Sequence, residues 1–425
     1  MRNLAPPGKP GLRTDADFAA NLDARKNRGK RRLALFMAAT VFAVVSLVTL
    51  IASVVNDAFG YVLLVDTVSP TTLARDGVAL EDLDGEALIA ILREHVSRRY
   101  FMKLEADAPL ADRPRAELLD LVMAEVVQSE AEKTWTFAQS VFDGKSVRAW
   151  VAENAPEGRL RFRAWLNPSF LKKSQAPRAL DAGVRGALLG SFLTILITLV
   201  FAFPIGIGAA VYLEEYARPN RFNRFIQTNI YNLAGVPSII YGMLGLTIFV
   251  RFMEPLTSGV FFGAVTDPTT ANGRTVFSAG LTLALLILPV IIINAQEALK
   301  AVPATLRYSS YAVGATKWQT ILHHVLPASM DRILTGTVLA VSRAVGETAP
   351  LVVVGASAFL TKDPTGIFSK FTTLPIQIYQ WTARPQQEYR NAAAAAILVL
   401  LALLLTLNAS AIVLRNRFRK NKRLG

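Results

Sequence analysis

An arginine and a glutamate of opposite charge lie inside an otherwise apolar segment, residues 333–356. Arg343 and Glu347 are four positions apart, so on a helix both side chains face one side within reach of an ion pair. A charge at bilayer depth costs at least about 2.5–3.5 kcal/mol, which favours a position facing the protein interior or a water-filled path. Because a guanidinium presents a rigid fork of donors, it suits a tetrahedral oxyanion. The pair, with the adjacent Thr348, predicts a substrate path; a structural ion pair that locks two spans is the alternative.

A second apolar segment, residues 229–253, is interrupted by small residues and a proline. Glycine and proline are commoner in membrane helices than in soluble ones, so a kink or a close helix contact is one interpretation. The other is a broken helix whose free N–H groups face an anion path. The residues of this predicted break are Gly235, Pro237, Ser238 and Gly242.

A strongly patterned loop, residues 301–327, separates two further apolar segments. Pro303 suits the first turn of a helix and Gly314 suits a helix end. The pattern then predicts a second short helix from about Lys317 to Leu326, ending before Pro327. Two short helices joined by a glycine turn form a compact knob that can enter a groove on a soluble partner. A mere connector would usually take only about 2–8 residues.

Several other kinds of chemistry are excluded by composition. The chain has no cysteine and three histidines, so it offers no thiolate site and too few histidines for a histidine-based metal centre. We expect the adjacent His323 and His324 to pack on a surface rather than bind metal. The sequence has no Gly-x-x-x-x-Gly-Lys-Ser/Thr loop and no acidic cluster for Mg²⁺. We therefore expect no catalytic residue, metal or cofactor in this chain, which is not an enzyme, and any energy for uphill movement must come from a partner.

The elements that position these residues are predicted membrane helices. The chain has 425 residues, is 52% hydrophobic and has a mean hydropathy of +0.35, and a span needs about 20 mostly apolar residues. Six segments qualify: Leu33–Val55, Gly186–Leu213, Asn229–Met253, Ser278–Asn294, Ile333–Ala356 and Ala392–Leu414. We interpret the first as an uncleaved anchor, because its polar head and apolar run are both too long for a signal peptide.

The distribution of charge sets the predicted orientation. Basic residues precede the first span and follow the last, so both termini are predicted to be cytoplasmic. Residues 56–185 then lie outside and carry 17 basic against 20 acidic residues. The net charge of +14 is therefore mostly a topology signal, which argues against nucleic-acid binding.

The expected organisation has five parts. They are a basic cytoplasmic segment 1–32, an anchor helix 33–55, an extracytoplasmic domain 56–185, a core 186–414 and a basic tail 415–425. Helical spacing from Leu88 to Val96 and from Leu118 to Val126 predicts that the external domain is small and mostly helical. It serves either as a lid on the outer membrane face or as a docking site for a partner protein.

The knob loop resembles the EAA loop of ABC importer permeases. Gly314, Leu326 and Pro327 match that motif in register, whereas Tyr308–Ser310 replace its Glu-Ala-Ala. The run Ser310–Ala315 is similar to the phosphate-specific members, the PstA family. Further blocks that resemble this family are Tyr212–Ala217, Asn232–Gly242, Arg343–Leu351 and Leu374–Tyr379. The resemblance covers residues 186–414, just over half of the chain, and leaves the external domain outside.

The resemblance implies an all-α, multi-pass protein of the bacterial inner membrane, with a five-helix type I permease core after the anchor helix. It implies that ATP and Mg²⁺ are bound by a PstB-like ATPase dimer, which contacts the knob through Ser310, Tyr311, Ala312, Gly314, Ala315, Leu326 and Pro327. The other implied partners are a PstC-like permease, a PstS-like phosphate-binding protein and inorganic phosphate. Two alternatives remain: a permease for phosphonate, sulfate or molybdate, and a membrane sensor without transport.

Overall fold

The computed structural model describes residues 15–75, 77–264, 272–357 and 359–421, and the chain divides into two compact units. The first unit extends to Val54 and contains most of one long helix, α1 (Asp15–Ala58). Apolar residues surround this helix on all sides over its second half, as expected of a membrane span rather than a surface helix. Its portion Arg25–Ala58 is long and apolar enough to cross a bilayer.

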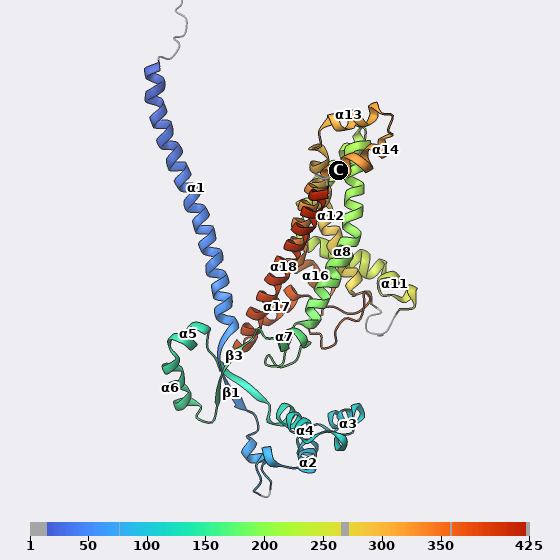
Figure 1. Ribbon diagram of the computed structural model, residues 1–425. Helices are drawn as coiled ribbons and strands as arrows, with labels where there is room; N and C mark the ends of the chain where they lie inside the picture. Colours follow the sequence, from blue (N-terminus) through green and yellow to red (C-terminus); the bar gives the residue numbers. More distant parts are fainter. Residues whose placement is uncertain (1–14, 76, 265–271, 358, 422–425) are drawn as a thin grey trace, which may run out of the picture. The chain divides into compact units, whose positions relative to one another are not determined.

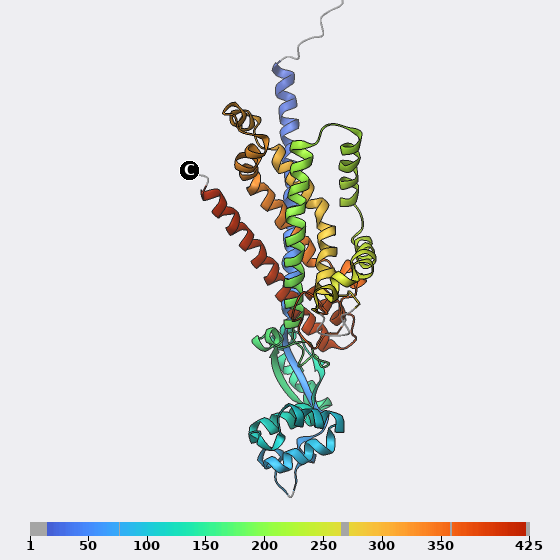
Figure 2. The ribbon, with the colours of Figure 1, turned by 90° about the vertical axis from the view of Figure 1, so that its right-hand side faces the viewer.

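The second unit begins at Val55 and contains the helices of the predicted core. Three of them are long and apolar enough to span: α8 (Arg185–Val211), α12 (Val276–Lys300) and α18 (Gln387–Asn421). Helix α12 is central and packs against α8 and α15 (Leu326–Gly346), as the views in Figures 1 and 2 show. Lipid offers no hydrophobic drive for helix association, so membrane helices associate through close packing. Small residues on α12 permit this close approach, and the helix is therefore buried.

Four of the six predicted spans therefore appear as single helices among the described residues. The third predicted span is a broken helix, one of the two interpretations that the sequence allowed. It consists of α9 (Arg221–Ala234) and α10 (Ser238–Gly245), which continues as a π-helix to Phe252. The two parts are bent by 108°. The proline at 237 explains the break, since its ring would clash with the carbonyl of Leu233 in a continuous helix.

The fifth predicted span, 333–356, is also interrupted. Helix α15 ends at Gly346, and α16 (Ala349–Val354) begins after two non-helical residues. Pro350 near the start of α16 accounts for the interruption, because proline cannot donate to the preceding turn. By length and composition neither α15 nor its pair with α16 is among the helices that qualify as a span. A membrane crossing at 333–356 therefore stays a prediction.

Helices α10 and α16 are packed so closely that glycine is required at 242. A Cβ on Gly242 would lie 2.7 Å from the Cα of Pro350, a backbone atom that cannot rotate away. We expect Gly242→Ala to destabilise the protein by about 1–3 kcal/mol, the usual cost of overpacking, measured as a lowered Tm in detergent. Gly208→Ala is the matched control, because its Cβ would meet nothing within 4 Å. Equal Tm values for the two variants would contradict the close packing.

Residues 56–185 fold into a small sheet and several short helices. The sheet has the order β2-β1-β3, with β1 (Phe59–Asp66) pairing antiparallel to β2 (Ser129–Thr134) and β3 (Arg159–Ala164). The sequence analysis predicted helices only and missed this sheet. Strand β2 is short and mostly charged, so it lacks the apolar alternation that indicates a half-buried strand, whereas β3 does alternate, with Leu160, Phe162 and Ala164 between arginines.

The predicted helices of this region are present. The residues from Leu88 to Leu92 lie on α2 (Gly85–His95), and those from Leu118 lie on α4 (Arg115–Val122) and the π-helix Met123–Val127 that follows. Their buried faces form an apolar cluster of their own. The remaining helices of the region are α3 (Arg98–Asp107), α5 (Phe137–Phe142), α6 (Gly144–Asn154) and α7 (Pro168–Lys172).

The sheet packs directly on the membrane helices of the same unit. Thr134 at the end of β2 donates to Asn391 of α18 over 2.9 Å in a buried hydrogen bond, and Asn391 donates to the carbonyl of Asp57 over 2.6 Å. Trp165 and Phe170 share an apolar cluster with Trp381 of α17 (Leu374–Thr382). The region is thus fixed to the ends of α17 and α18 rather than tethered by its chain alone.

Candidate substrate path and coupling site

The predicted ion pair is formed, but its geometry differs from two residues on one helix. The Nε of Arg343 lies 3.3 Å from the Oε1 of Glu347. Glu347 follows the last residue of α15 in an extended conformation, with φ −75° and ψ 122°. The pair therefore joins the last turn of α15 to the unwound segment before α16. The side chain of Arg343 is 49% exposed and that of Glu347 is 18% exposed, so the guanidinium faces open space in this chain.

The two helix interruptions meet beside Arg343. Tyr241 on α10 is buried in the same apolar cluster as Ala344 and Val345 of α15. Its hydroxyl donates to the carbonyl of Leu233 over 2.7 Å, which satisfies an acceptor freed at the end of α9. Because α10 packs on α16, the break in one helix lies next to the break in the other. Irregular backbone at membrane depth is tolerated where it is buried or lines a cavity.

The residues predicted at the helix break have distinct positions. Gly235 caps the C-terminus of α9, Pro237 is the N-cap of α10 and Ser238 is its first residue. Gly242 lies in the α10–α16 contact described above. Thr348 is the N-cap of α16, and its side chain makes no capping hydrogen bond. Whether any of them meets a substrate stays a prediction.

The knob at the other end of the core is a two-helix structure, labelled α13 and α14 in Figure 1. Helix α13 (Ala304–Ala312) ends before Gly314, which has φ +85°, and α14 (Lys317–Thr320) follows. The predicted end before Pro327 was wrong: α14 continues through a π-helix, Ile321–Val325, into α15. The π turn admits the proline because the N–H of Leu326 bonds to Ile321, five residues back.

Hydrogen bonds within the knob hold its two helices together. The hydroxyls of Ser310 and Thr320 are 2.9 Å apart, and both residues are buried. Thr316 and Gln319 form a capping box at the start of α14. Of the residues predicted to contact an ATPase, Ser310 therefore lies inside the knob. Tyr311, Ala312, Gly314 and Pro327 are exposed, whereas Ala315 and Leu326 are half-buried.

An ion pair that the sequence analysis did not predict fastens the knob to the membrane helices. The Nη2 of Arg307 on α13 lies 2.6 Å from the Oε1 of Glu215, in the π-helix Tyr212–Tyr216 that ends α8. The same guanidinium donates to the carbonyls of Val302 and Leu299, over 2.8 and 3.0 Å. These carbonyls lie at and just beyond the end of α12. One side chain thus ties α13 to both α8 and α12; only the charge of Glu215 past the second span hinted at it.

The outer surface of the knob is apolar for a solvent-facing element. Val313 is 84% exposed, although valine prefers burial. The other large apolar side chains exposed there are Tyr308, Tyr311, Trp318 and Leu322. An exposed apolar cluster on a polar rim is typical of a protein-binding surface. Of these residues, the sequence analysis noted Tyr308, as a departure from the EAA pattern, and Tyr311, as a predicted ATPase contact.

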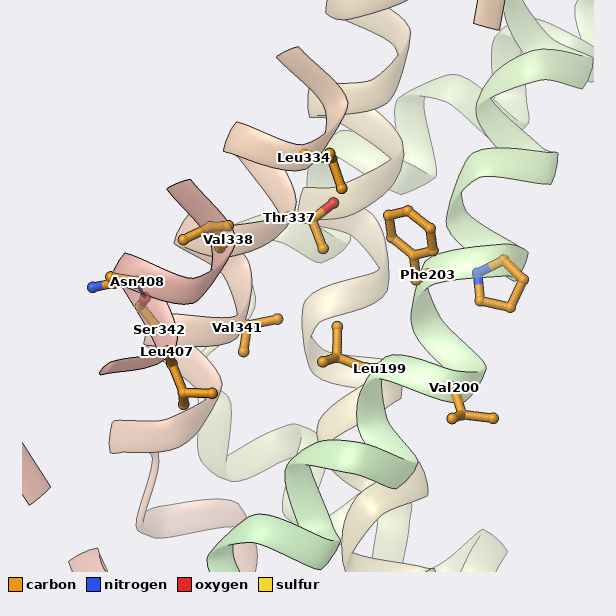
Figure 3. Close-up of a pocket in the computed structure, with 12 residues that line it drawn as sticks. Leu199, Val200, Phe203, Leu334, Thr337, Val338, Val341, Ser342, Leu407 and Asn408 are labelled. Carbon is orange, nitrogen blue, oxygen red and sulfur yellow. Dashed lines mark hydrogen bonds between the residues drawn. The ribbon is translucent and has the colours of Figure 1, made fainter. Parts of the chain in front are cut away.

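A separate pocket of about 530 Å³ lies between α8, α15 and α18 (Figure 3). Its lining is almost entirely apolar, with Leu199, Phe203 and Val341 among the residues that point into it. Ser342 donates to Asn408 at its rim over 2.7 Å. Arg343 is not among the lining residues, since each residue turns a helix by about 100°. The pocket is therefore separate from the predicted substrate path at Arg343 and Glu347.

The core contains two interrupted helices next to an ion pair, and its knob has an apolar outer face. These features are typical of a membrane transport subunit. Residues 202–420 match the family described as "Binding-protein-dependent transport system inner membrane component". The match covers just over half of the chain, and the protein belongs to this family. It is accordingly a multi-pass inner-membrane permease and a non-catalytic component.

Curated relatives include both permeases of phosphate transport systems. The chain is 34% identical over 249 residues to the phosphate transport system permease protein PstA of Yersinia pestis, covering 58% of this chain and 76% of that protein. It is 35% identical over 201 residues to PstC of Pasteurella multocida, covering 44% and 60%. Among solved structures, a chain of the inward-facing MetNI methionine ABC transporter aligns with a TM-score of 0.39 and 17% identity, covering 56% of this chain and 96% of that chain.

Proposed function

We propose that this chain is the PstA-like permease subunit of an ATP-driven importer of inorganic phosphate. The observation that carries the proposal is the Arg343–Glu347 pair at the meeting point of two interrupted helices, in a chain whose relatives are phosphate permeases. The match to PstA is longer than the match to PstC, 249 against 201 residues, which favours the PstA-like position. An exposed guanidinium offers paired donors to a tetrahedral oxyanion.

In this proposal the partners occupy opposite ends of the core. A PstB-like ATPase dimer, which binds ATP and Mg²⁺, docks on the knob, and a PstC-like permease supplies the other half of the path. A PstS-like binding protein delivers phosphate at the end where α8 and α18 pack on the sheet. Both termini are cytoplasmic, as the basic residues at each end predict. ATP binding closes the dimer, moves the knobs and rocks the helices around the path.

Uptake of radiolabelled phosphate tests the proposed substrate. Cells deleted for this gene should regain uptake at micromolar phosphate when they express the wild-type chain together with its partner subunits. Uptake should be lost when ATP is depleted, because this chain supplies no energy itself. Failure of the wild-type chain to restore uptake would refute phosphate as the substrate, and phosphonate, sulfate and molybdate would be tested next.

Substitutions on the apolar surface of the knob test the proposed ATPase contact. We expect Val313→Asp and Trp318→Ala each to reduce co-purification of the ATPase subunit at least about tenfold, because hot-spot residues of an interface contribute about 2 kcal/mol or more each. Phe142→Asp is the matched control: Phe142 is 83% exposed but lies in the region 56–185, far from the knob in the sequence. ATPase retention by both knob variants would argue for docking elsewhere.

A further inference from the structure

A polar pocket of about 440 Å³ lies where three segments of the core meet, away from the knob. The segments are the residues just before α12, the C-terminal end of α16, and the loop between α16 and α17. The lining residues are Asn272, Arg274, Val352, Gly355, Ala356, Ser357 and Lys370. We propose that Arg274 and Lys370 bind a tetrahedral oxyanion here, as an outer station that phosphate occupies before it reaches Arg343. The inference rests on the proposed phosphate transport.

Backbone hydrogen bonds bring the two cationic residues together although they are distant in sequence. The N–H of Val276, two residues after Arg274, donates to the carbonyl of Ser369 over 3.1 Å. Ser357 donates to the carbonyl of Phe371 over 2.8 Å, so the loop is fixed on both sides of Lys370. Thr275 is buried and donates to the carbonyl of Thr257 over 2.7 Å. The pocket is thus built on fixed backbone.

The backbone at Gly355 is shaped to admit Arg274. Gly355 has φ +106°, a conformation that residues with a Cβ rarely adopt. A Cβ there would lie 2.6 Å from the Cδ of Arg274, so the arginine side chain crosses the space that only glycine leaves open. The close approach of the arginine to this turn places its guanidinium at the pocket rather than leaving it free on the surface.

The charge of the pocket is not neutralised by the described residues. Neither Arg274 nor Lys370 has a carboxylate within 4.0 Å in the described part of the chain, unlike Arg185, which lies 2.5 Å from Asp363. Asp363 is the sole acidic residue of the loop 357–373, and it is already engaged by Arg185 and Ser174. Two cations that share a pocket without an anion attract one from solution, and the nearby hydroxyl of Ser357 and amide of Asn272 can complete its hydrogen bonds.

The place of the pocket in the core suits an entry station. It lies at the C-terminal end of α16, whereas Glu347 and Thr348 lie at the N-terminal end of the same helix. Six residues of helix span only about 9 Å, so an anion passes between the two sites in a short step. The pocket precedes α12 and the knob follows α12, which places them at opposite ends of that helix. An anion entering from the end opposite the knob meets Arg274 first.

The absence of cysteine from the chain gives a direct probe. In the assembled transporter, Ser357→Cys places one thiol in the pocket, and its reaction with an anionic and a cationic methanethiosulfonate reagent reports the local charge. We expect a preference for the anionic reagent of about tenfold at low salt, as a cleft of one charge sign produces. Inorganic phosphate should slow the labelling. The combined change Arg274→Gln and Lys370→Gln should abolish both effects.

Matched controls separate this site from general surface charge. Lys362→Gln removes a cation from the same loop but outside the pocket and should leave both effects intact. Phe142→Cys should show neither. No reagent preference, or no slowing by tens of millimolar phosphate, would overturn the proposed station. Equal slowing by sulfate would support an oxyanion station that does not select phosphate.

Uptake assays on the same variants distinguish this inference from the proposed function. We expect Arg274→Gln with Lys370→Gln to raise the phosphate concentration for half-maximal uptake several-fold while the maximal rate changes little. If the wild-type chain supports no phosphate uptake, the proposed function fails, and the labelling still decides whether an anion binds. If uptake is normal in the wild type but the labelling is insensitive to phosphate, the outer station alone is refuted.

Discussion

Phosphate uptake should fall about 10- to 100-fold when Arg343 is replaced by glutamine. The estimate follows from the loss of a hydrogen-bonded charge, which is worth about 1.5–3 kcal/mol. Glutamine keeps much of the side-chain length but removes the charge and the paired donors that suit a tetrahedral anion. Arg343→Lys should recover part of the activity, because lysine restores the charge but not the planar fork. The measurement is initial uptake of radiolabelled phosphate at equal membrane abundance.

Arg332→Gln on the same helix is the matched control for this result. Arg332 lies near the other end of α15 and is exposed, and it has no part in the ion pair with Glu347. Its replacement should leave uptake close to wild type. Unchanged uptake in Arg343→Gln would instead support a purely structural ion pair that locks α15 to the segment before α16. In that case the variant should show only a lowered Tm.

Removing the Arg307–Glu215 pair should uncouple ATP hydrolysis from transport. The two side chains are only 18% and 7% exposed, and loss of one partner from a buried pair costs about 3–5 kcal/mol because the other charge stays buried. In Arg307→Met the knob loses its bonds to both α8 and α12, so movement of the ATPase is no longer passed to the core. We expect uptake to be abolished while the ATPase still co-purifies, since the apolar outer face of the knob is unchanged.

Two further variants distinguish the buried Arg307–Glu215 pair from an ordinary surface ion pair. Lys300→Gln breaks an exposed pair with Glu297 and a longer contact of 3.9 Å with Glu214, and should cost no more than about 1 kcal/mol because Lys300 is solvent-exposed. Combining Arg307→Met with Glu215→Leu removes both charges and should recover much of the Tm, yet uptake should stay low. A Tm for Arg307→Met equal to that of Lys300→Gln would contradict the large stabilising contribution expected of the Arg307–Glu215 pair. Normal uptake in Arg307→Met would show that coupling passes through other contacts.

Much of the architecture followed from the sequence because the bilayer imposes long apolar segments. The four single spans, α1, α8, α12 and α18, lie close to their predicted ranges for this reason. The two helices of the knob could also be predicted from the sequence, since a proline, a glycine and a long patterned loop specify them locally. The ion pair of Arg343 and Glu347 followed from the rarity of charge in an apolar segment.

Other features depended on contacts that no local pattern contains. The sheet of residues 56–185 was missed because the charged strands β2 and β3 gain their stability from pairing with β1, a non-local contact. At 229–253 the sequence left a kink and a broken helix open, and the structure has the broken helix. The predicted continuous helix at 333–356 was wrong because hydropathy measures length and not continuity. The sequence alone does not decide whether Pro237 and Pro350 kink or break their helices. In the structure, α10 packs on α16, and Tyr241 satisfies the carbonyl freed at Leu233, so both helices are broken.

The sequence by itself therefore determined the class of protein, the approximate spans and the ion pair of Arg343 with Glu347. The tertiary structure alone decided which distant residues share a site: Arg307 with Glu215, and Arg274 with Lys370. The physical reason is that apolar length and helix-ending residues act over a few positions of the chain. Charge pairing and pocket formation instead depend on how helices from remote positions are packed together.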